Sequence, residues 1–510
     1  MLACAHLKKM DPLIFAVITS LFFSLWCAYG FFINPDGIIY INFAQFISFD
    51  TSLLEHPLRV NLPFYSLLIK LVHQVTPFSW ENAALFTNAL LMALLIAGYI
   101  QIIKVLGGST LTCWIAAAVI LTHPELNYFR AYIIRDIGFW ALLYWNLYAL
   151  IKYQQTNLLR YIVLWYIVAV GAALFRVEGF VLAGLGPLFL VFSSGISSSE
   201  RIKRIVLFYG FELLALISVS LVVIFSGKYF GIIDHLTSLF NYWFDYITLG
   251  FVANWKEMTS RVLTSMPRFF QASYINVFFL GGLIAYFLLR LINMFYPLHA
   301  ILFLYGVRKK CFPGGFAASW RLISYWGFLT LFIAAIFLTK MVFLSGRYVF
   351  PACLIGLIVI PFTVEFLYRK YEFSFWKKYP RLNIILAVLL MLGLLLSGLV
   401  SFGYSKEYMK QASAWIKDNT PENSSLYTNS VQIAFYAERQ GENWKESTAD
   451  LPIIDVLSTN AWRHYDYLGI AVKKREKDLL QLMPTSLQMQ PVAQFSNKRG
   501  DTVYVFKVGH

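Results

Sequence analysis

Long apolar runs recur along the first four-fifths of the chain, and they constrain its fold more than any other feature. Of its 510 residues, 59% are hydrophobic and only 14% are charged, which is far from a soluble globular composition. A helix needs about 17 to 25 mostly apolar residues to cross the hydrocarbon core of a bilayer. The sequence therefore predicts an α-helical polytopic membrane protein.

The apolar runs define about eleven expected spans. The third, fourth and sixth are short enough for a tilted or half-length helix. The first is expected to be a retained signal-anchor helix, because it lacks a clear small-residue cleavage site before the polar "NPDG". The spans are placed near residues 13–33, 82–106, 110–123, 137–151, 159–175, 179–193, 205–225, 275–306, 321–339, 347–367 and 382–403.

Lys and Arg residues indicate the orientation, because loops that stay in the cytoplasm retain them. With the N-terminus inside, alternate loops carry the basic residues, from Lys104 and Lys152 to the "YRKYEFSFWKKYPR" loop. This alternation requires residues 275–306, which contain Arg290, to make one net crossing, with the surplus in a bent or interfacial helix. The residues after the last span are then expected outside the cytoplasm.

Net charge and cysteine usage exclude some classes of partner and site. The net charge of +15 is explained by these topology signals and by contact with anionic lipid head groups, so no nucleic-acid partner is expected. The five cysteines show no paired metal-type spacing, and none follows Cys353. The outer part of the chain is therefore not expected to be held by disulfides.

Three regions outside the membrane are large enough to have a function of their own. Residues 1–403 form the expected transmembrane domain, with outer loops at 34–81 and 226–274. The first loop contains the helical "YINFAQFI" and "PFYSLLIKLVHQV", and the second contains "FNYWFDYITLGFVANW", which is typical of an interfacial helix. Residues 404–510 are expected to form a small α/β domain. They contain an amphipathic stretch, "SKEYMKQASAWIKDNTP", a helical "KKREKDLLQLM", and the strand-like runs "SSLYTNS", "LGIAV", "PVAQF" and "DTVYVFKV".

Two acidic residues are expected at the same depth on the outer face. Asp36 lies in a Pro-Asp-Gly turn directly after the first span, and Asp136 lies at the head of the fourth span. Two carboxylates placed in this way could form one site. The alternative is structural, because Asp is common in turns and favours the positive N-terminal end of a helix.

The order of four stretches resembles a known class. They are an Asp-x-x-x-Tyr turn after the first span, an acid-x-Pro stretch in "LLEHPLRVNLPFYSLLIKL", an Arg-x-Tyr-x-x-x-Asp stretch before a later helix, and a "GRYVFP" entry to a late helix. In this order, the chain is similar to the membrane glycosyltransferases of the GT-C class. Within that class it resembles the bacterial branch that includes protein O-mannosyltransferase-like enzymes and lipid A aminoarabinose transferases.

This resemblance implies a hexosyl- or pentosyltransferase of the bacterial inner membrane. Such an enzyme takes a sugar from a polyprenyl-phosphate donor and transfers it to lipid A, another envelope glycan or a protein on the outer face. Asp36 matches the base that accepts the acceptor's proton, and transfer would invert the anomeric centre. Asp136 is the second expected catalytic acid.

Cationic groups are expected to face the phosphate, because negative charge grows on it as it leaves. Arg347 and Tyr348 match the donor-phosphate region of the aminoarabinose transferases. Arg59 and Arg135 are further expected phosphate ligands, and Arg130, Arg176 and Lys340 are other cations on the outer side. Arg176 and Glu178 in "FRVEGF" are expected to form a structural ion pair.

The resemblance also raises a divalent metal ion as a possible cofactor. Glu55 matches an acid that, with Asp136, holds a metal in some members of the class. In this chain, His56 stands where those members have a lysine, and a histidine can itself ligate a metal.

Other functions remain open from the sequence. A polyprenyl-linked oligosaccharide polymerase or ligase would share the membrane and the carrier but would use a diphosphate donor. A lipid or glycolipid transporter would carry ionisable residues near the midplane and broken helices in repeated halves, which are largely missing apart from Glu212 and Arg290. A non-enzymatic sensor with the outer tail as its binding domain is a third alternative.

The predicted topology is testable with a fused reporter. A reporter that is active only in an oxidising compartment is expected to be active when attached after His510. A reporter that works only in the cytoplasm, attached at the same place, serves as the control. Strong activity of the cytoplasmic reporter would contradict the predicted orientation.

Overall fold

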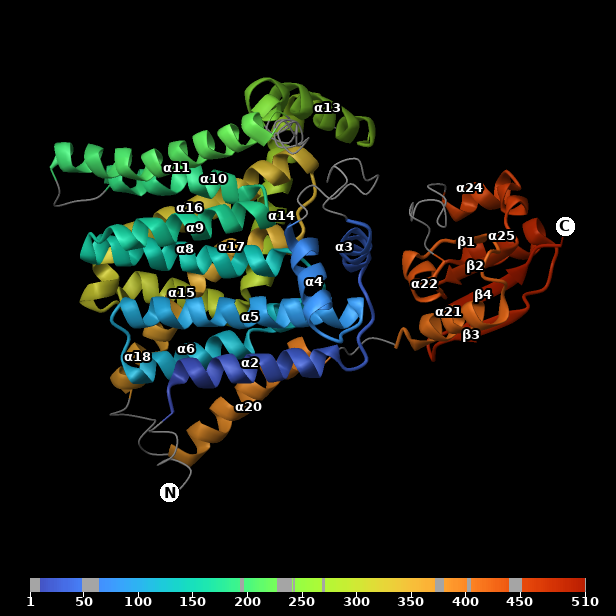
Figure 1. Cartoon of the computed structure of the whole chain (residues 1–510), viewed down its shortest axis with the longest axis horizontal. Helices are drawn as coiled ribbons and strands as arrows, with labels where there is room; N and C mark the ends of the chain where they lie inside the picture. Colours follow the sequence, from blue (N-terminus) through green and yellow to red (C-terminus); the bar gives the residue numbers. More distant parts are fainter. Residues whose placement is uncertain are drawn as a thin grey trace.

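The computed structural model describes residues 10–47, 64–192, 197–226, 241, 244–267, 271–371, 380–400, 405–439 and 452–509. Long helices lie side by side in a bundle, and a small sheet with its own helices lies beyond one end of this bundle, near α3 (Figure 1). The helices of the bundle are α2 (Pro12–Ala28), α3 (Pro35–Phe46), α4 (Phe64–Val75), α5 (Trp80–Val105), α6 (Thr110–Thr122), α7 (Pro124–Arg130), α8 (Asp136–Thr156), α9 (Leu159–Phe175), α10 (Glu178–Leu185), α11 (Ser198–Ser226), α13 (Phe251–Thr264), α14 (Ile275–Phe295), α15 (Pro297–Lys309), α16 (Gly314–Met341), α17 (Gly346–Leu357), α18 (Ile360–Tyr371) and α20 (Pro380–Leu399).

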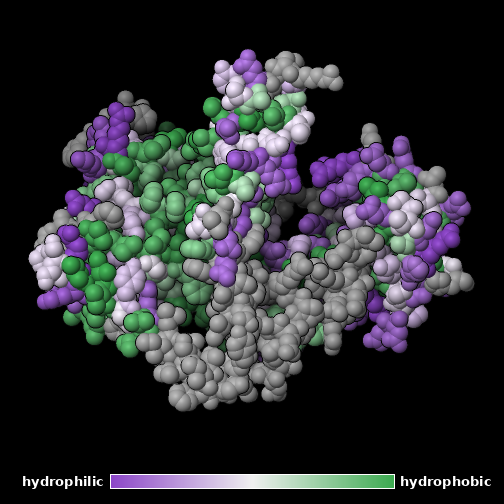
Figure 2. All heavy atoms as spheres, turned by 90° about the horizontal axis from the view of Figure 1, so that it is seen from above, coloured by the Kyte–Doolittle hydropathy of each residue, from purple (hydrophilic) through white to green (hydrophobic). Residues whose placement is uncertain are grey.

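The bundle has the surface that contact with lipid requires. Each of the eleven predicted apolar runs contains a helix, and among the described residues four helical segments are long and apolar enough to cross a membrane. Large hydrophobic side chains are exposed on outer helices, among them Ile18 and Phe22 of α2 and Leu389 of α20. Figure 2 shows the hydrophobic surface over the bundle and hydrophilic residues over the C-terminal part. The number of crossings itself stays a prediction.

The over-long run at residues 275–306 is broken into two helices. Tyr296 has a φ of 67°, and Pro297 follows it, so that α14 ends and α15 begins at this point. Helix α14 packs on α17, and α15 packs on α18. Because α17 and α18 follow each other along the chain, α14 and α15 pack along successive parts of one segment. This arrangement supports a single bent crossing.

The neighbouring segment α17–α18 is also interrupted, and buried tyrosines satisfy its carbonyl groups. At the end of α17 the N–H groups of Ile358 and Val359 donate to Ile355 and Gly356, and Pro361 has no N–H to donate to Leu357. The hydroxyl of Tyr144 on α8 donates to the carbonyl oxygen of Leu354 at 2.7 Å, and that of Tyr99 on α5 donates to Leu357 at 2.9 Å. Hydrogen bonds of this kind are needed because lipid offers no partner to a free carbonyl.

The C-terminal part contains one sheet of four strands with helices on both faces. Its elements are α21 (Glu407–Asn419), β1 (Leu426–Thr428), α22 (Val431–Tyr436), α24 (Ile453–Ser458), β2 (Tyr467–Val472), α25 (Lys477–Leu487), β3 (Ala493–Ser496) and β4 (Thr502–Lys507). The strand order is β1-β2-β4-β3, with β1 parallel to β2 and the other pairs antiparallel. Along β4, Val503 and Val505 face α21, whereas Phe506 packs in the cluster with α24 and α25. The four predicted strands and two predicted helices of this region are confirmed.

The C-terminal part is fastened to the segment between α2 and α3. The hydroxyl of Tyr436 accepts a hydrogen bond from the backbone N–H of Ile33 at 3.0 Å and donates to the carboxylate of Glu81 at 2.9 Å. The ammonium of Lys410 donates to the carbonyl oxygen of Phe31 at 2.5 Å. The helices α21 and α22 therefore contact the same end of the bundle from which α3 begins.

The predicted Pro-Asp-Gly turn is wrong, because these residues form the first turn of α3. Pro35 occupies the first helical position, where a missing N–H costs nothing and the fixed φ of proline suits a helix. Asp36 follows in the first turn, where the helix dipole favours a negative charge. Asp36 is thus held by a helix rather than by a loop.

Asn34 fixes the position of α3 against the start of α8. Its side-chain oxygen accepts from the backbone N–H of Ile133 at 2.8 Å, and its amide donates to the carbonyl oxygen of Ile133 at 3.1 Å. Gly37 permits this close approach, because a Cβ there would lie 2.9 Å from the Cβ of Ile133. The start of α3, which contains Asp36, is therefore held against the segment before α8, which begins with Asp136. The residues in contact are Asn34, Gly37 and Ile133.

Replacing Asn34 should destabilise the protein. Asn34→Ala leaves two buried backbone groups of Ile133 without partners, and each such group costs about 1 to 3 kcal/mol. We expect the apparent midpoint of thermal unfolding in detergent to fall by several degrees. Asn293→Ala on α14, whose side chain is exposed, serves as the control, and equal midpoints for the two variants would contradict the role of Asn34.

Candidate functional site

Charged residues from four parts of the bundle meet at the end nearest the C-terminal sheet. Asp36 lies in the first turn of α3, and Asp136 begins α8. Arg347 lies in the first turn of α17, whereas Arg176 and Glu178 flank the short connection between α9 and α10. Residues far apart in the sequence are therefore brought together by helix ends.

These side chains form a continuous chain of ion pairs. The Nη1 atom of Arg347 lies 2.5 Å from Oδ2 of Asp36 and 3.7 Å from Oδ2 of Asp136. The other carboxylate oxygen of Asp136 contacts the guanidinium of Arg176, which also contacts the carboxylate of Glu178. Arg347 thus links the two acids that the sequence singled out.

The members of this series of ion pairs differ in how far they are exposed to solvent. The side chain of Asp136 is 2% exposed and that of Arg176 is 8% exposed, whereas Asp36 is 39% exposed and Arg347 is 27% exposed. Buried charges require close partners, and the two guanidinium groups supply them to Asp136. Asp36 is the acid that an incoming molecule can reach.

Glycine allows α8 and the end of α9 to approach closely. A Cβ at Gly138, two residues after Asp136, would lie 2.3 Å from the ring of Phe175. Phe175 directly precedes Arg176, so this packing sets the position of the guanidinium opposite Asp136. The sequence predicted the pair of Arg176 with Glu178, but the additional contact with Asp136 depends on this packing.

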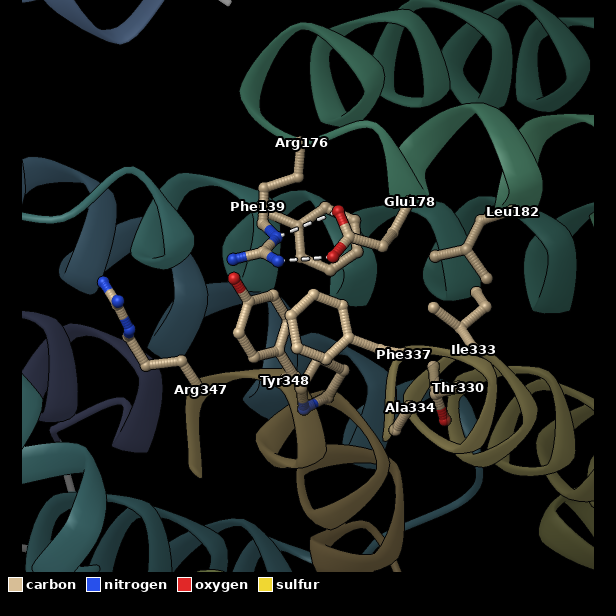
Figure 3. A pocket seen from close by; sticks show the side chains of 11 residues that line it. Phe139, Arg176, Glu178, Leu182, Thr330, Ile333, Ala334, Phe337, Arg347 and Tyr348 are labelled. Atoms are coloured by element: carbon tan, nitrogen blue, oxygen red, sulfur yellow. Dashed lines mark hydrogen bonds and ion pairs between the residues drawn. The ribbon is translucent and has the colours of Figure 1, made fainter. Parts of the chain in front are cut away.

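Tyr348 faces the same cluster from α17. Its ring stacks on Phe337 with a centroid distance of 3.9 Å, and the guanidinium carbon of Arg176 lies 4.6 Å from the centre of its ring. Figure 3 shows the hydroxyl of Tyr348 directed toward Arg176, with Arg347 beside it. A planar cation and an aromatic face attract each other in this geometry.

A pocket extends from these cations into the bundle. Arg176, Arg347 and Tyr348 lie at its polar end, and the remaining lining residues are mostly apolar (Figure 3). They are Phe139, Leu182, Thr330, Ile333, Ala334, Phe337 and Pro351, with Glu178 beside Arg176. The pocket is small, with a volume of about 20 Å³, and its lining combines a cationic end with mostly apolar walls.

Tyr40 and the predicted Arg135 also lie near the cluster. Burial raises the pKa of Tyr40 to about 12, so its hydroxyl stays protonated one helical turn after Asp36. Arg135 directly precedes α8 and interacts electrostatically with Tyr40 and Glu178. Among the described residues, no hydrogen bond or ion pair engages the side chain of Arg135. Arg59 and Glu55 lie outside the described residues.

The other candidate cations do not join this cluster. Arg130 is 3% exposed, and its guanidinium donates to the Oγ of Ser20 at 3.0 Å and of Ser24 at 2.7 Å. It therefore fastens α7 to α2. The ammonium of Lys340 lies 5.0 Å from the ring centre of Tyr246.

The described surroundings of Asp136 do not fit a divalent metal ion. Its two carboxylate oxygens face Arg176 and Arg347, and these guanidinium groups would repel a second cation. Within the ranges that the structure describes, no three His, Cys, Asp or Glu side chains gather in a metal-binding group. A metal site that includes Glu55 stays a prediction.

Sequence comparisons identify no relative. No family model matches the chain, and no curated protein matches it.

Solved structures do resemble the chain. The oligosaccharyltransferase AglB from Archaeoglobus fulgidus, in complex with an inhibitory peptide and a dolichol-phosphate, aligns with a TM-score of 0.54 and 11% identity, over 97% of this chain and 73% of that chain. ArnT from Cupriavidus metallidurans in the apo state aligns with a TM-score of 0.40 and 14% identity, over 94% of this chain and 95% of that chain. The same protein bound to undecaprenyl phosphate aligns with a TM-score of 0.41 and 14% identity, over 97% of this chain and 96% of that chain. The alignments to ArnT are too loose to support an argument, but the likeness to AglB confirms the expected fold. The chain has the fold of the GT-C class membrane glycosyltransferases.

Proposed function

We propose that the protein is an inverting glycosyltransferase that moves a sugar from a polyprenyl-phosphate donor to an envelope glycolipid, glycan or protein. The observation that carries this proposal is the junction of the ion-pair chain with the apolar pocket. Arg347 belongs to both, because it contacts Asp36 and also lines the pocket. A donor with a charged phosphate and a hydrocarbon tail matches these two environments.

The pocket supports binding of the donor in one orientation. The hydrocarbon chain would lie against Leu182, Ile333 and Ala334, and the phosphate would lie at Arg347 and the hydroxyl of Tyr348. Guanidinium groups bind phosphate oxygens through charge-assisted hydrogen bonds. The dolichol-phosphate named for AglB is a molecule of the same kind, and we extend it to this chain only as part of this proposal.

The chemistry we propose is a single displacement. The acceptor hydroxyl oxygen attacks the anomeric carbon, the bond between that carbon and the phosphate oxygen breaks, and polyprenyl phosphate leaves with the bonding electrons. Asp36 accepts the hydroxyl proton, because it is the exposed acid of the cluster. Arg347 stabilises the charge that grows on the phosphate.

Asp136 has a positioning role in this mechanism. It is nearly inaccessible, so it cannot reach an acceptor, but it holds Arg176 and Arg347 at the pocket. Arg347 is shared between Asp36 and the donor phosphate, so binding of the donor would draw Arg347 away from Asp36. The carboxylate of Asp36 would then be free to accept a proton when the donor is present.

Removing the base should abolish most of the turnover. Asp36→Asn keeps the size of the side chain but cannot accept the proton, and loss of a general base lowers turnover by about 100- to 10,000-fold. The measurement is transfer of labelled sugar from polyprenyl-linked donors into envelope fractions of a strain that lacks the chromosomal copy. Wild-type transfer by Asp36→Asn, at equal expression, would refute the role of Asp36 as the base.

Removing the phosphate ligands should weaken donor binding. A ligand that binds only the folded state raises the apparent thermal stability, so polyprenyl phosphate is expected to stabilise the wild-type protein in detergent. Arg347→Gln and Tyr348→Phe should reduce this shift, and Arg308→Gln, an exposed arginine in the last turn of α15, should not. Absence of a shift for the wild type would argue for the transporter or sensor alternatives.

A further inference from the structure

A second cleft lies between the C-terminal part and the start of the bundle. It has a volume of about 470 Å³, which is within the range of small-molecule sites. Its walls come from the beginning of α21, the end of β2, the turn before β4 and Phe32. The proposed donor site does not involve this cleft.

The two acidic residues of the cleft already have hydrogen-bond partners within the C-terminal part. Asp501 accepts hydrogen bonds from the backbone N–H of Lys474 at 3.0 Å and from the side chain of Asn497 at 3.1 Å. Glu476 accepts from the backbone N–H of Lys473 at 3.0 Å and lies 3.7 Å from its ammonium. These carboxylates therefore hold the walls of the cleft in place.

The side chain of Lys406 retains capacity for a ligand. Partial burial, together with the nearby ammonium of Lys473, lowers the pKa of Lys406. The ammonium of Lys406 lies 5.0 Å from the centre of the Phe32 ring, and no carboxylate among the described residues pairs with it. Three cationic residues, Lys406, Lys473 and Arg499, line the cleft, so an anion bound there would be stabilised by several like charges.

The cleft also offers uncharged donors of hydrogen bonds. The side-chain oxygen of Gln432 accepts from Ser430 at 3.0 Å, and the amide hydrogens of Gln432 have no partner among the described residues. Tyr408 also lines the cleft. A ligand that fits these groups carries negative charge and several oxygen acceptors, as a phosphorylated sugar does.

The position of the cleft connects it to the proposed catalytic acid. Phe32 lies four residues before Asp36 in the sequence. The hydrogen bond from Ile33 to Tyr436 and the pair of bonds between Asn34 and Ile133 hold the intervening residues. A molecule bound in the cleft is therefore held next to the segment that begins α3.

We propose that this cleft binds a phosphorylated sugar group of the acceptor and presents the acceptor to Asp36. This inference rests on the proposed function, because it takes the second substrate to be a glycan. Lys406 and Lys473 bind the phosphate, and Gln432 binds sugar oxygens. The acceptor is thus recognised by the C-terminal part, and the donor is recognised by the bundle.

The test uses the full-length protein in detergent, with glucose 6-phosphate, glucose and inorganic phosphate as probes in binding titrations. Glucose 6-phosphate should bind most tightly. Lys406→Gln combined with Lys473→Gln should weaken its binding by about tenfold, and added salt should weaken it further. Lys498→Gln, an exposed lysine near the cleft that does not line it, is the control and should have no effect.

Each other result would overturn part of the inference. Equal affinity of the double variant and the wild type, or no binding of glucose 6-phosphate, would refute the cleft as its site. Glucose binding as tightly as glucose 6-phosphate would refute the role of the phosphate, and inorganic phosphate binding equally well would refute recognition of the sugar. An octyl glycoside of glucose 6-phosphate distinguishes two supporting cases, because tighter binding indicates a lipid-borne head group and equal binding a soluble glycan.

The failure of this inference can be distinguished from the failure of the proposed function. Stabilisation by polyprenyl phosphate without binding of glucose 6-phosphate would leave the donor site intact and refute the cleft. Binding of glucose 6-phosphate without any response to polyprenyl phosphate would leave the cleft as a sugar-phosphate site but refute its role in presenting an acceptor.

Discussion

The buried carboxylate of Asp136 is the constraint on which the arrangement of this site depends. A charge that is 2% exposed inside an apolar bundle is costly unless cations lie against it. Arg176 approaches one oxygen and Arg347 the other, so the ends of α9 and α17 must converge on the start of α8. The same convergence places Arg347 within reach of Asp36 and brings Tyr348 beside Arg176.

The position of α17 is determined by both of its ends. Its first turn carries Arg347 and Tyr348, and its last turn accepts hydrogen bonds from Tyr99 and Tyr144. These tyrosines are fully buried on α5 and α8. Polar contacts deep in the bundle thus support the charged contact at its end, and Arg347 is held by a helix rather than by a loop.

Periodicity and apolar length predict the elements of this protein well, because they depend on local sequence. The apolar runs form helices, and the strand-like runs that contain β2 and β4 form strands. Contacts across long sequence distances are harder to predict. The role of Asn34 depends on the backbone of Ile133, and the pair of Arg176 with Asp136 depends on the glycine contact at Gly138, so neither pattern is visible in a single chain segment.

The candidate site shows the same division. The two acids were predicted at one end of the bundle from helix order alone, and Arg347 and Tyr348 came from the resemblance. The helical rather than turn-like setting of Asp36 was missed, because Asn-Pro-Asp-Gly is a strong turn signal and also an acceptable start of a helix. Tertiary contacts of Asn34 decide between the two.

The short segment from Phe31 to Gly37 joins three parts of the molecule. Phe31 accepts a hydrogen bond from Lys410, and Ile33 donates one to Tyr436, both in the C-terminal part. Gly37, at the end of the segment, packs against Ile133. The two hydrogen bonds involve backbone groups of this segment, so the C-terminal part is attached to the residues that lead into Asp36. Transfer between two bound substrates is accelerated when their reacting groups are held in a fixed relation. In the proposed enzyme, this segment is what would fix an acceptor on the C-terminal part relative to the acid that accepts its proton.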